Sequence, residues 1–482
     1  MGATLGLKLN EDWLVKNSVI YVQNYFLRAL AEERASFLLS ALRSLFDMLK
    51  QTKYTADDGA LFCELAFNVA RTLELQAKAS SAMSDDCKAA LDVCAAAATV
   101  GTAMERKRIL WTRARIQKAA GQPPTLDGDE TAQLLSLAEL MRLEQADGKG
   151  ASEHLKKVPP LVEKCPDNPE LFTRLAQLAL GFNDRRLSIE LARKVIDALP
   201  EGVGILPRVR RWLALAESLF GQALMALLDP DKHERPVQDS LRQQSAAHFV
   251  KCARHAAMLS LWPLVLQASQ RWWNAMLPFM GSAVTREVLA ESLGELVEIT
   301  MQMEPTFEAE FRLKLLILLL ESLSDRKQWK EALAASDLGL SRLPSGVCNS
   351  IWEMRVGIVG ALGRSAAGDL SQMKDVTPEV QAKVLLTLAR SAQKPEQLAA
   401  YQSALDSLAK SGTSSKLATA EVHIEFAQWL FENKFPIEDA QDQLLNAADL
   451  LGELDPSLGE FAHSAADRSP TQACAPHAAQ AV

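Results

Sequence analysis

The chain has 482 residues, of which 48% are hydrophobic and 23% charged, a composition typical of a folded protein and not of a disordered one. Its net charge of −8 excludes a general electrostatic attraction to nucleic acid or to an anionic membrane. The seven cysteines are scattered without a Cys-x-x-Cys pair, which predicts neither a disulfide framework nor a zinc site. The N-terminus lacks a basic start followed by an apolar stretch, so no secretory signal is predicted and we expect an intracellular, soluble protein.

Helical periodicity runs through nearly the whole sequence. Apolar residues recur at intervals of three and four, which is the spacing of one helix face, and sustained strand-type alternation is absent. Short breaks rich in proline separate these segments, as helical hairpins require. The pattern predicts an all-α protein, a right-handed α-solenoid of degenerate tetratricopeptide-like helical hairpins.

The first predicted domain is a set of helical hairpins over residues 1–120. Asn10, followed by Glu11 and Asp12, is expected to cap a helix that runs through Tyr21 and Phe26.

The strongest charge feature of this domain is the segment 105–118, which has six bases against one acid. One interpretation is a contact for an acidic partner, such as a tubulin tail, calmodulin or an RNA phosphate. The bases fall all round the predicted helix, however, and Ile109 and Ile116 form its clearest apolar stripe. This favours a packed solenoid helix whose arginines extend to the surface. The tentative partner-contact residues are Arg106, Lys107, Arg108, Arg113, Arg115 and Lys118.

Residues 121–166 are predicted to be a linker with irregular helices, because proline pairs occur at 123–124 and 159–160. The acidic run 127–130 lacks the alternating ligands of a calcium loop. A polar turn followed by a capped helix is the better interpretation.

Residues 167–455 are predicted to form a tetratricopeptide-like α-solenoid. In the stretch 170–200, Asn183 and Asp184 make the turn, Ser188 and Ala192 are small residues that let helices approach, and Pro200 ends the unit.

Three further units follow in the same domain. Trp329 begins the second helix of the stretch 313–344, which has a small Gly339 and ends at Pro344. Two weaker units are indicated by Tyr401 and Ala404, and by Phe431, Ile437, Ala440 and Ala447. Residues 456–482, rich in Ala, Ser and Pro, are predicted to be a disordered tail.

No chemical motif stands out. The sequence has no phosphate-binding loop, nucleophile elbow or His-Glu-x-x-His, and its histidines are isolated. We therefore predict no catalytic residue, metal or cofactor, and a protein that is not an enzyme. The cluster of Trp262, Trp272 and Trp273 is interpreted as packing, because only Arg271 accompanies it.

Three aromatic stretches carry a family resemblance. They are residues 12–25, residues 271–278 together with 247–250, and residues 425–431 continuing to 435–439. Their order and separation resemble the cilia- and flagella-associated protein 46 family, whose members are far longer, so this chain is similar to one block of such a protein.

The resemblance implies a tetratricopeptide-type structural scaffold of the ciliary central apparatus, located in the axoneme, that supports assembly and regulation of ciliary motility. It also implies other central-apparatus projection subunits as partners, with calmodulin and tubulin as further candidates, and neither nucleic acid nor membrane. A generic cytosolic adaptor that binds peptide segments is the alternative. The structural anchors implied by the motifs and the hairpins are Trp13, Asn17, Trp273, Asn274, Trp329 and Trp429.

Overall fold

The fold is known from a computed structural model, which describes residues 1–32, 34–53, 58–79, 83–150, 153–199, 206–364, 377–391, 394–410 and 416–454. Within these ranges the regular elements are all helices, as predicted. The chain divides into two compact units, residues 1–275 and residues 276–482, which are described separately below.

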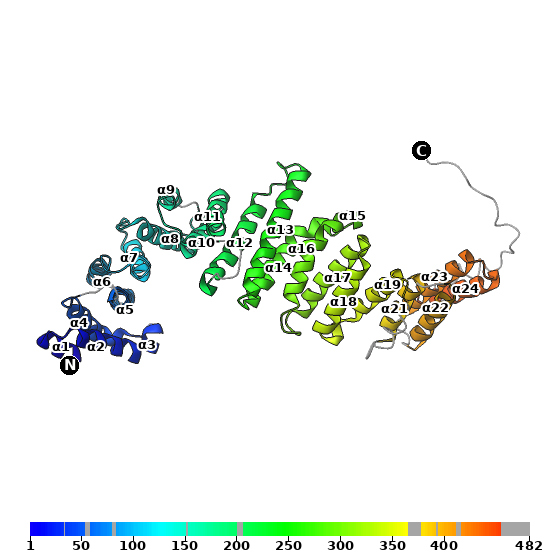
Figure 1. The fold of residues 1–482 in the computed structure, drawn as a ribbon, viewed down its shortest axis with the longest axis horizontal. Helices are drawn as coiled ribbons and strands as arrows, with labels where there is room; N and C mark the ends of the chain where they lie inside the picture. The colour runs from blue at the N-terminus through cyan, green and yellow to red at the C-terminus, as the bar shows by residue number, and fades with distance from the viewer. Residues whose placement is uncertain are drawn as a thin grey trace. The chain divides into compact units, whose positions relative to one another are not determined.

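The first unit begins with short helices and continues with longer hairpins (Figure 1). Consecutive helices pack against each other, most extensively α5 on α6, α10 on α11 and α12 on α13. The helices are α1 (Gly2–Leu9), α2 (Asp12–Tyr25), α3 (Leu27–Ala31), α4 (Leu39–Leu49), α5 (Gly59–Ala79), α6 (Met83–Ala97), α7 (Lys107–Ala119), α8 (Glu130–Ala146), α9 (Val158–Val162), α10 (Pro169–Gly181), α11 (Arg185–Ala198), α12 (Pro207–Leu227), α13 (Arg235–Ala257) and α14 (Trp262–Met276).

The second unit repeats the same arrangement. Its helices pack in sequence order, α17 on α18, α21 on α22 and α23 on α24, so each hairpin contacts mainly its neighbours, as in a helical repeat. The helices are α15 (Ala283–Arg286), α16 (Ala290–Thr300), α17 (Ala309–Asp325), α18 (Trp329–Arg342), α19 (Asn349–Ala361), α21 (Pro378–Ser391), α22 (Lys394–Ala409), α23 (Lys416–Glu432) and α24 (Ile437–Leu454).

The predicted hairpin of residues 170–200 is confirmed in the residues that the structure describes. Asn183 has a φ of 66°, the left-handed conformation that closes the turn, and the Asp184 side chain accepts a hydrogen bond from the Leu187 N–H at the start of α11. Ser188 and Ala192 are fully buried, so their small side chains let α11 approach its neighbours. Pro200 lies outside the described residues.

The hairpin at Trp329 is also confirmed. Trp329 is the first residue of α18, and the helix ends at Arg342, two residues before Pro344. Gly339 is closely packed, because a Cβ atom there would meet Cδ2 of Leu316 on α17 and Cδ1 of Ile351 on α19, and those side chains would have to shift.

The cap predicted at Asn10 is wrong. Asn10 ends α1 with a φ of 57°, and α2 starts after Glu11 without a side-chain cap. Asn is common both before and after a helix. Its side chain can cap a helix N-terminus, and its backbone tolerates the left-handed conformation that ends a helix.

The segment 121–166 is more regular than a linker. Its acidic turn does precede a capped helix, since Asp129 accepts a hydrogen bond from the Ala132 N–H at 2.8 Å. That helix, α8, buries a nearly continuous run of side chains in the core that also holds Phe172 and Leu175 of α10. The prolines at 159–160 instead begin the short helix α9.

The unit boundary between residues 275 and 276 lies inside the predicted 167–455 solenoid, and not near residue 120 or 166. The predicted tail, residues 456–482, lies outside the described residues. Among the residues that the structure describes, no helix has the length and apolar character needed to cross a membrane.

Candidate protein-interaction groove

The basic segment 105–118 lies on and just before α7, where its outer bases form ion pairs within the first unit. Lys107 Nζ lies 2.9 Å from Glu170 Oε1 on α10, and Lys118 Nζ lies 2.5 Å from Asp147 Oδ2. Arg108 Nη1 lies 2.9 Å from Glu64 Oε1 on α5. These bases therefore tie α7 to the helices and the turn around it.

The remaining bases of the segment point into the fold. Arg113 is only 6% exposed and donates to the Thr125 carbonyl at 3.0 Å, while Arg115 lies 3.2 Å from the buried carboxylate of Glu74. Arg106 donates to the carbonyls of Ala98 and Thr102. All six bases thus have partners inside the unit, which favours packing over the tentative contact for an acidic partner.

Glu170 is the centre of this ion network. Burial would raise the pKa of its carboxyl, but the hydrogen bond and charge of Lys107 and the charge of Arg174 outweigh burial and hold the pKa below its usual value. Arg208 adds a third cation at 3.3 Å. Glu170 thus joins α7, α10 and α12.

Two of the predicted anchors near the N-terminus do not pack. The Trp13 side chain is 57% exposed and its Nε1 donates to Glu11 at 2.8 Å, while Asn17 is exposed on the same helix face. The prediction of buried anchors is wrong here, because the buried face of α2 carries Val15 and Val19 instead.

The anchors predicted at 273 and 274 are displaced by one residue. Trp272 is fully buried, whereas Trp273 is half-buried and Asn274 is exposed. Adjacent residues of a helix point about 100° apart, so only one of the two tryptophans can face the core fully.

Trp329 and Trp429 are both partly buried. Trp429 packs against the rings of Tyr401, Phe426 and Phe435, with centroids 5.7, 6.2 and 5.3 Å away, and its Nε1 donates to Gln397 at 2.9 Å. It therefore links α22, α23 and the turn before α24.

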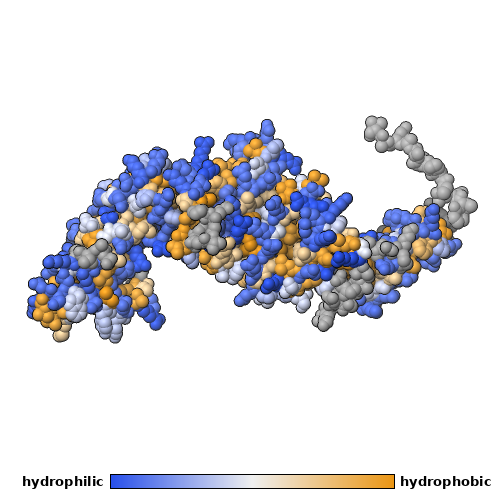
Figure 2. All heavy atoms as spheres, viewed as in Figure 1, coloured by the Kyte–Doolittle hydropathy of each residue, from blue (hydrophilic) through white to orange (hydrophobic). Residues whose placement is uncertain are grey.

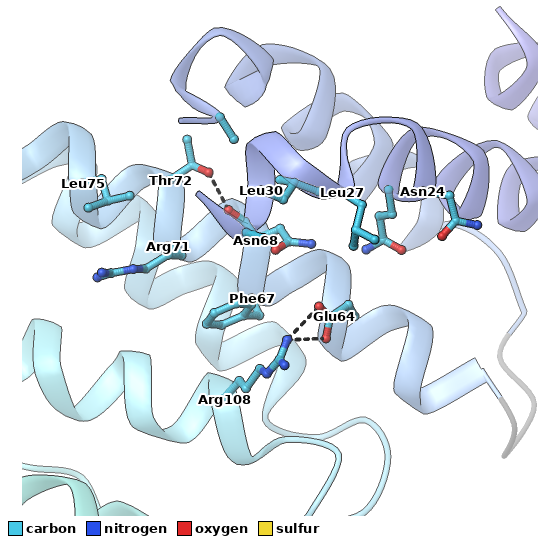
Figure 3. Close-up of a pocket in the computed structure, with 13 residues that line it drawn as sticks. Asn24, Leu27, Leu30, Glu64, Phe67, Asn68, Arg71, Thr72, Leu75 and Arg108 are labelled. Carbon is cyan, nitrogen blue, oxygen red and sulfur yellow. Dashed lines mark hydrogen bonds and ion pairs between the residues drawn. The ribbon is translucent and has the colours of Figure 1, made fainter. Parts of the chain in front are cut away.

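A groove of about 490 Å³ lies in the first unit between α2–α3 and α5. Figure 3 shows Asn24, Leu27 and Leu30 along one wall and Phe67 and Asn68 along the other, with Arg108 and Glu64 paired at the edge. Leucine and phenylalanine walls with interspersed amides suit an extended peptide, because amides can donate to and accept from its backbone.

An exposed aromatic face adjoins this groove on α2. Tyr21 and Tyr25 are 69% and 70% exposed and stack with their ring centroids 6.1 Å apart. Together with Trp13 they follow the four-residue spacing of one helix face. The sequence analysis predicts that these aromatic residues pack. Val15 and Val19, which form a separate apolar face of the same helix, are the signal that the aromatic face is exposed.

No metal-binding cluster accompanies the groove in the part of the chain that the structure describes. No group of three or more His, Cys, Asp or Glu side chains converges there as metal ligands would. The six described cysteines are free thiols and buried, and burial raises the pKa of Cys63 to about 11 and those of Cys94 and Cys252 to about 12. A raised pKa favours the protonated thiol, which is a weaker nucleophile than the thiolate.

Comparison with curated proteins shows similarity to a ciliary protein. No family model matches the chain. Cilia- and flagella-associated protein 46 of Chlamydomonas reinhardtii is 29% identical over 315 residues, which cover 61% of this chain and 11% of that protein. The matched segment is thus a small part of the relative's own length.

Two solved structures align along most of the chain. The Rap protein complexed with competence and sporulation factor has a TM-score of 0.27 and 13% identity, covering 92% of this chain and 99% of its own. A circular tandem repeat protein has a TM-score of 0.23 and 15% identity, covering 96% and 95%. The curated relative confirms the family resemblance predicted from the three aromatic motifs: this chain is similar to one segment of cilia- and flagella-associated protein 46.

Proposed function

We propose that the chain is a structural scaffold of the ciliary central apparatus, where it helps to build a projection on a central-pair microtubule and supports ciliary motility. The observation that carries this proposal is the alignment with a cilia- and flagella-associated protein over 61% of the chain. The helical-repeat fold supports it, because stacked hairpins offer extended surfaces for partner proteins.

The proposed partners are other projection subunits, with calmodulin and tubulin as further candidates. The ion pairs of α7 argue against the basic segment as the contact for an acidic tubulin tail or for calmodulin. The exposed aromatic face of α2 and the adjoining groove are better suited to a protein partner, since aromatic side chains are enriched at the centres of interfaces.

Fractionation of cilia tests this function. A tagged copy is expected to stay with the axoneme after detergent extraction and to be missing from axonemes of mutants that lack the central pair. A radial-spoke protein serves as the control that remains in those mutants. Recovery of the tagged copy mainly in the detergent-soluble fraction would contradict the proposal.

A peptide-binding adaptor is the second candidate, and the groove favours it. Asn24 and Asn68 project from successive hairpins into one hollow beside Arg71, the kind of amide and basic lining that an extended peptide requires. Substitution of Asn68 by Ala is expected to weaken binding of peptide partners if the adaptor function holds, while axonemal recovery would be unchanged if the scaffold function alone holds.

A further inference from the structure

The hairpin of α23 and α24 exposes large apolar side chains at seven-residue intervals. Leu417, Ile424 and Phe431 on α23 are 57%, 43% and 67% exposed, and Ile437 and Leu444 on α24 are 55% and 50% exposed. A seven-residue interval keeps side chains on one face of a helix. These five residues form what we call the α23–α24 seam.

Both helices contribute to the same side of the hairpin. Four of the five seam residues lie three positions before a buried alanine. The pairs are Leu417 and Ala420, Ile424 and Ala427, Ile437 and Ala440, and Leu444 and Ala447. The helices α23 and α24 are antiparallel and pack closely along these alanines. A side chain three positions before an alanine is rotated about 60° from it, and in two antiparallel helices these rotations point to the same side of the hairpin.

The seam is not explained by the packing of the unit. Phe426 and Leu430 of α23 bury themselves against Tyr401 and Ala400 of α22, with Ala440 of α24 in the same cluster. The core of the hairpin is therefore complete without the seam residues. Large apolar side chains exposed together on one side of a hairpin are typical of an interaction site.

The hairpin that carries the seam is acidic. Residues 416–454 contain eight carboxylate side chains against two lysines, a net charge of −6 with His423 counted as neutral, and Lys416 is already paired with Glu453 at 2.7 Å. Glu421 lies four residues after Leu417 and three before Ile424, so it stands beside the seam on α23. Figure 2 shows apolar and hydrophilic surface side by side over these two helices.

This charge pattern selects among occupants of the seam. A second copy of the chain would bring two acidic faces together, which is unfavourable because like charges repel. Residues 455–482 of the chain itself contain one arginine against three carboxylates, so they offer no complement either.

We propose that the α23–α24 seam binds an amphipathic helix of a partner protein whose apolar stripe is flanked by lysine or arginine. The apolar stripe of the partner packs between Phe431, Ile424 and Leu444, and its basic side chains meet Glu421 beside the seam and the net negative charge of the hairpin. The inference concerns a different surface from the groove of the first unit and does not depend on where in the cell the protein resides.

Peptide binding to the full chain tests the proposal. The probe is a fluorescein-labelled 18-residue synthetic helix with leucines at intervals of three and four and lysines on both flanks, and the matched peptide carries glutamates in place of the lysines. We expect the lysine peptide to bind at least tenfold more tightly than the glutamate peptide, with an affinity that falls as salt rises. Equal binding of the two peptides, or no binding of the lysine peptide, would overturn the proposal.

Variants then place the binding on the seam. Phe431→Ser with Leu444→Gln should weaken the lysine peptide at least tenfold, whereas Val284→Gln, a control at an 80% exposed apolar residue of the same unit, should change it by less than twofold. Glu421→Gln keeps the apolar surface and should weaken the lysine peptide and lower the salt dependence of its binding. Unchanged circular dichroism melting curves show that the variants fold.

One outcome would assign the seam to a second copy of the chain. If sedimentation velocity shows that the chain is a dimer and Phe431→Ser makes it a monomer, self-association occupies the seam and the proposal is wrong.

Discussion

A single carboxylate, that of Glu170, connects three helices of the first unit. Its side chain is almost fully buried and accepts from Lys107, Arg174 and Arg208, whose own side chains are progressively more exposed. Buried carboxylates of this kind remain charged only because cations surround them.

Glu170→Gln should therefore destabilise the first unit by about 1–3 kcal/mol, measured by urea unfolding at pH 7. Because the pKa of Glu170 is lowered in the folded state, its contribution is present above the usual pKa of 4.5 and is lost as the pH falls through the lowered value. The difference between the two proteins should then shrink in acid.

Glu153→Gln is the matched control, since Glu153 pairs with Lys156 on the surface with side chains 86% and 76% exposed. It should leave the unfolding curve unchanged. An equal effect of both substitutions would mean that the Glu170 network does not hold α7, α10 and α12 together.

At this scale the sequence predicts which residue types pack, but not which member of a pair faces inward. Trp272 and Trp273 are chemically identical, and only the exact rotation of α14 buries the first. The sequence also leaves open whether the six bases of the segment 105–118 are paired or free. Partners such as Glu64 and Glu170 come from helices far away in the sequence.

Among the helices, Trp429 shows how one element is held to its neighbours. Its ring contacts span α22, α23 and the turn at Phe435, and its Nε1–H is satisfied by Gln397. Trp429→Ala should lower the free energy of unfolding by about 2–4 kcal/mol. This is less than for a fully buried tryptophan, because the Trp429 side chain is only partly buried.

The loss should be local, because each hairpin of a repeat contacts mainly its neighbours. Hydrogen exchange should rise over residues 421–452 and stay unchanged before residue 50. Trp13→Ala is the control, since that side chain is largely exposed and should leave stability almost unaltered. If Trp429→Ala leaves exchange unaltered, the ring is an interface residue and not a packing one.

The existence of most helices, and several of their turns, could be predicted from periodicity and turn residues such as Asn183 and Asp184. The capped start of α8 could be predicted from the acidic turn before it, but the regular helix over Glu130–Ala146 could not, because two proline pairs flank it and proline occurs both in loops and in the first turn of a helix. The groove could not be predicted, since Asn24 and Asn68 meet only once α2 and α5 are packed.

At the scale of the whole molecule, the division into two units at residue 275 has no sequence signal. It lies within α14, whose pattern is that of an ordinary packed helix with Trp272 and Met276 buried. Such a boundary depends on which residues contact each other across the fold, and it cannot be recognised in the local sequence. The resemblance to a ciliary protein, in contrast, could be predicted from the three aromatic motifs, and the match to cilia- and flagella-associated protein 46 over 61% of the chain agrees with it.

The buried thiols have a consequence for experiments on this protein. Cys63 lies on α5, Cys94 on α6, Cys252 on α13 and Cys348 just before α19, so the free cysteines sample hairpins along much of the chain. Each is shielded from solvent and protonated while its hairpin is closed, and becomes open to alkylation when that hairpin opens. Pulsed iodoacetamide labelling read by mass spectrometry would then give the order in which the hairpins open. The natural cysteines are the probes, so no cysteine has to be introduced.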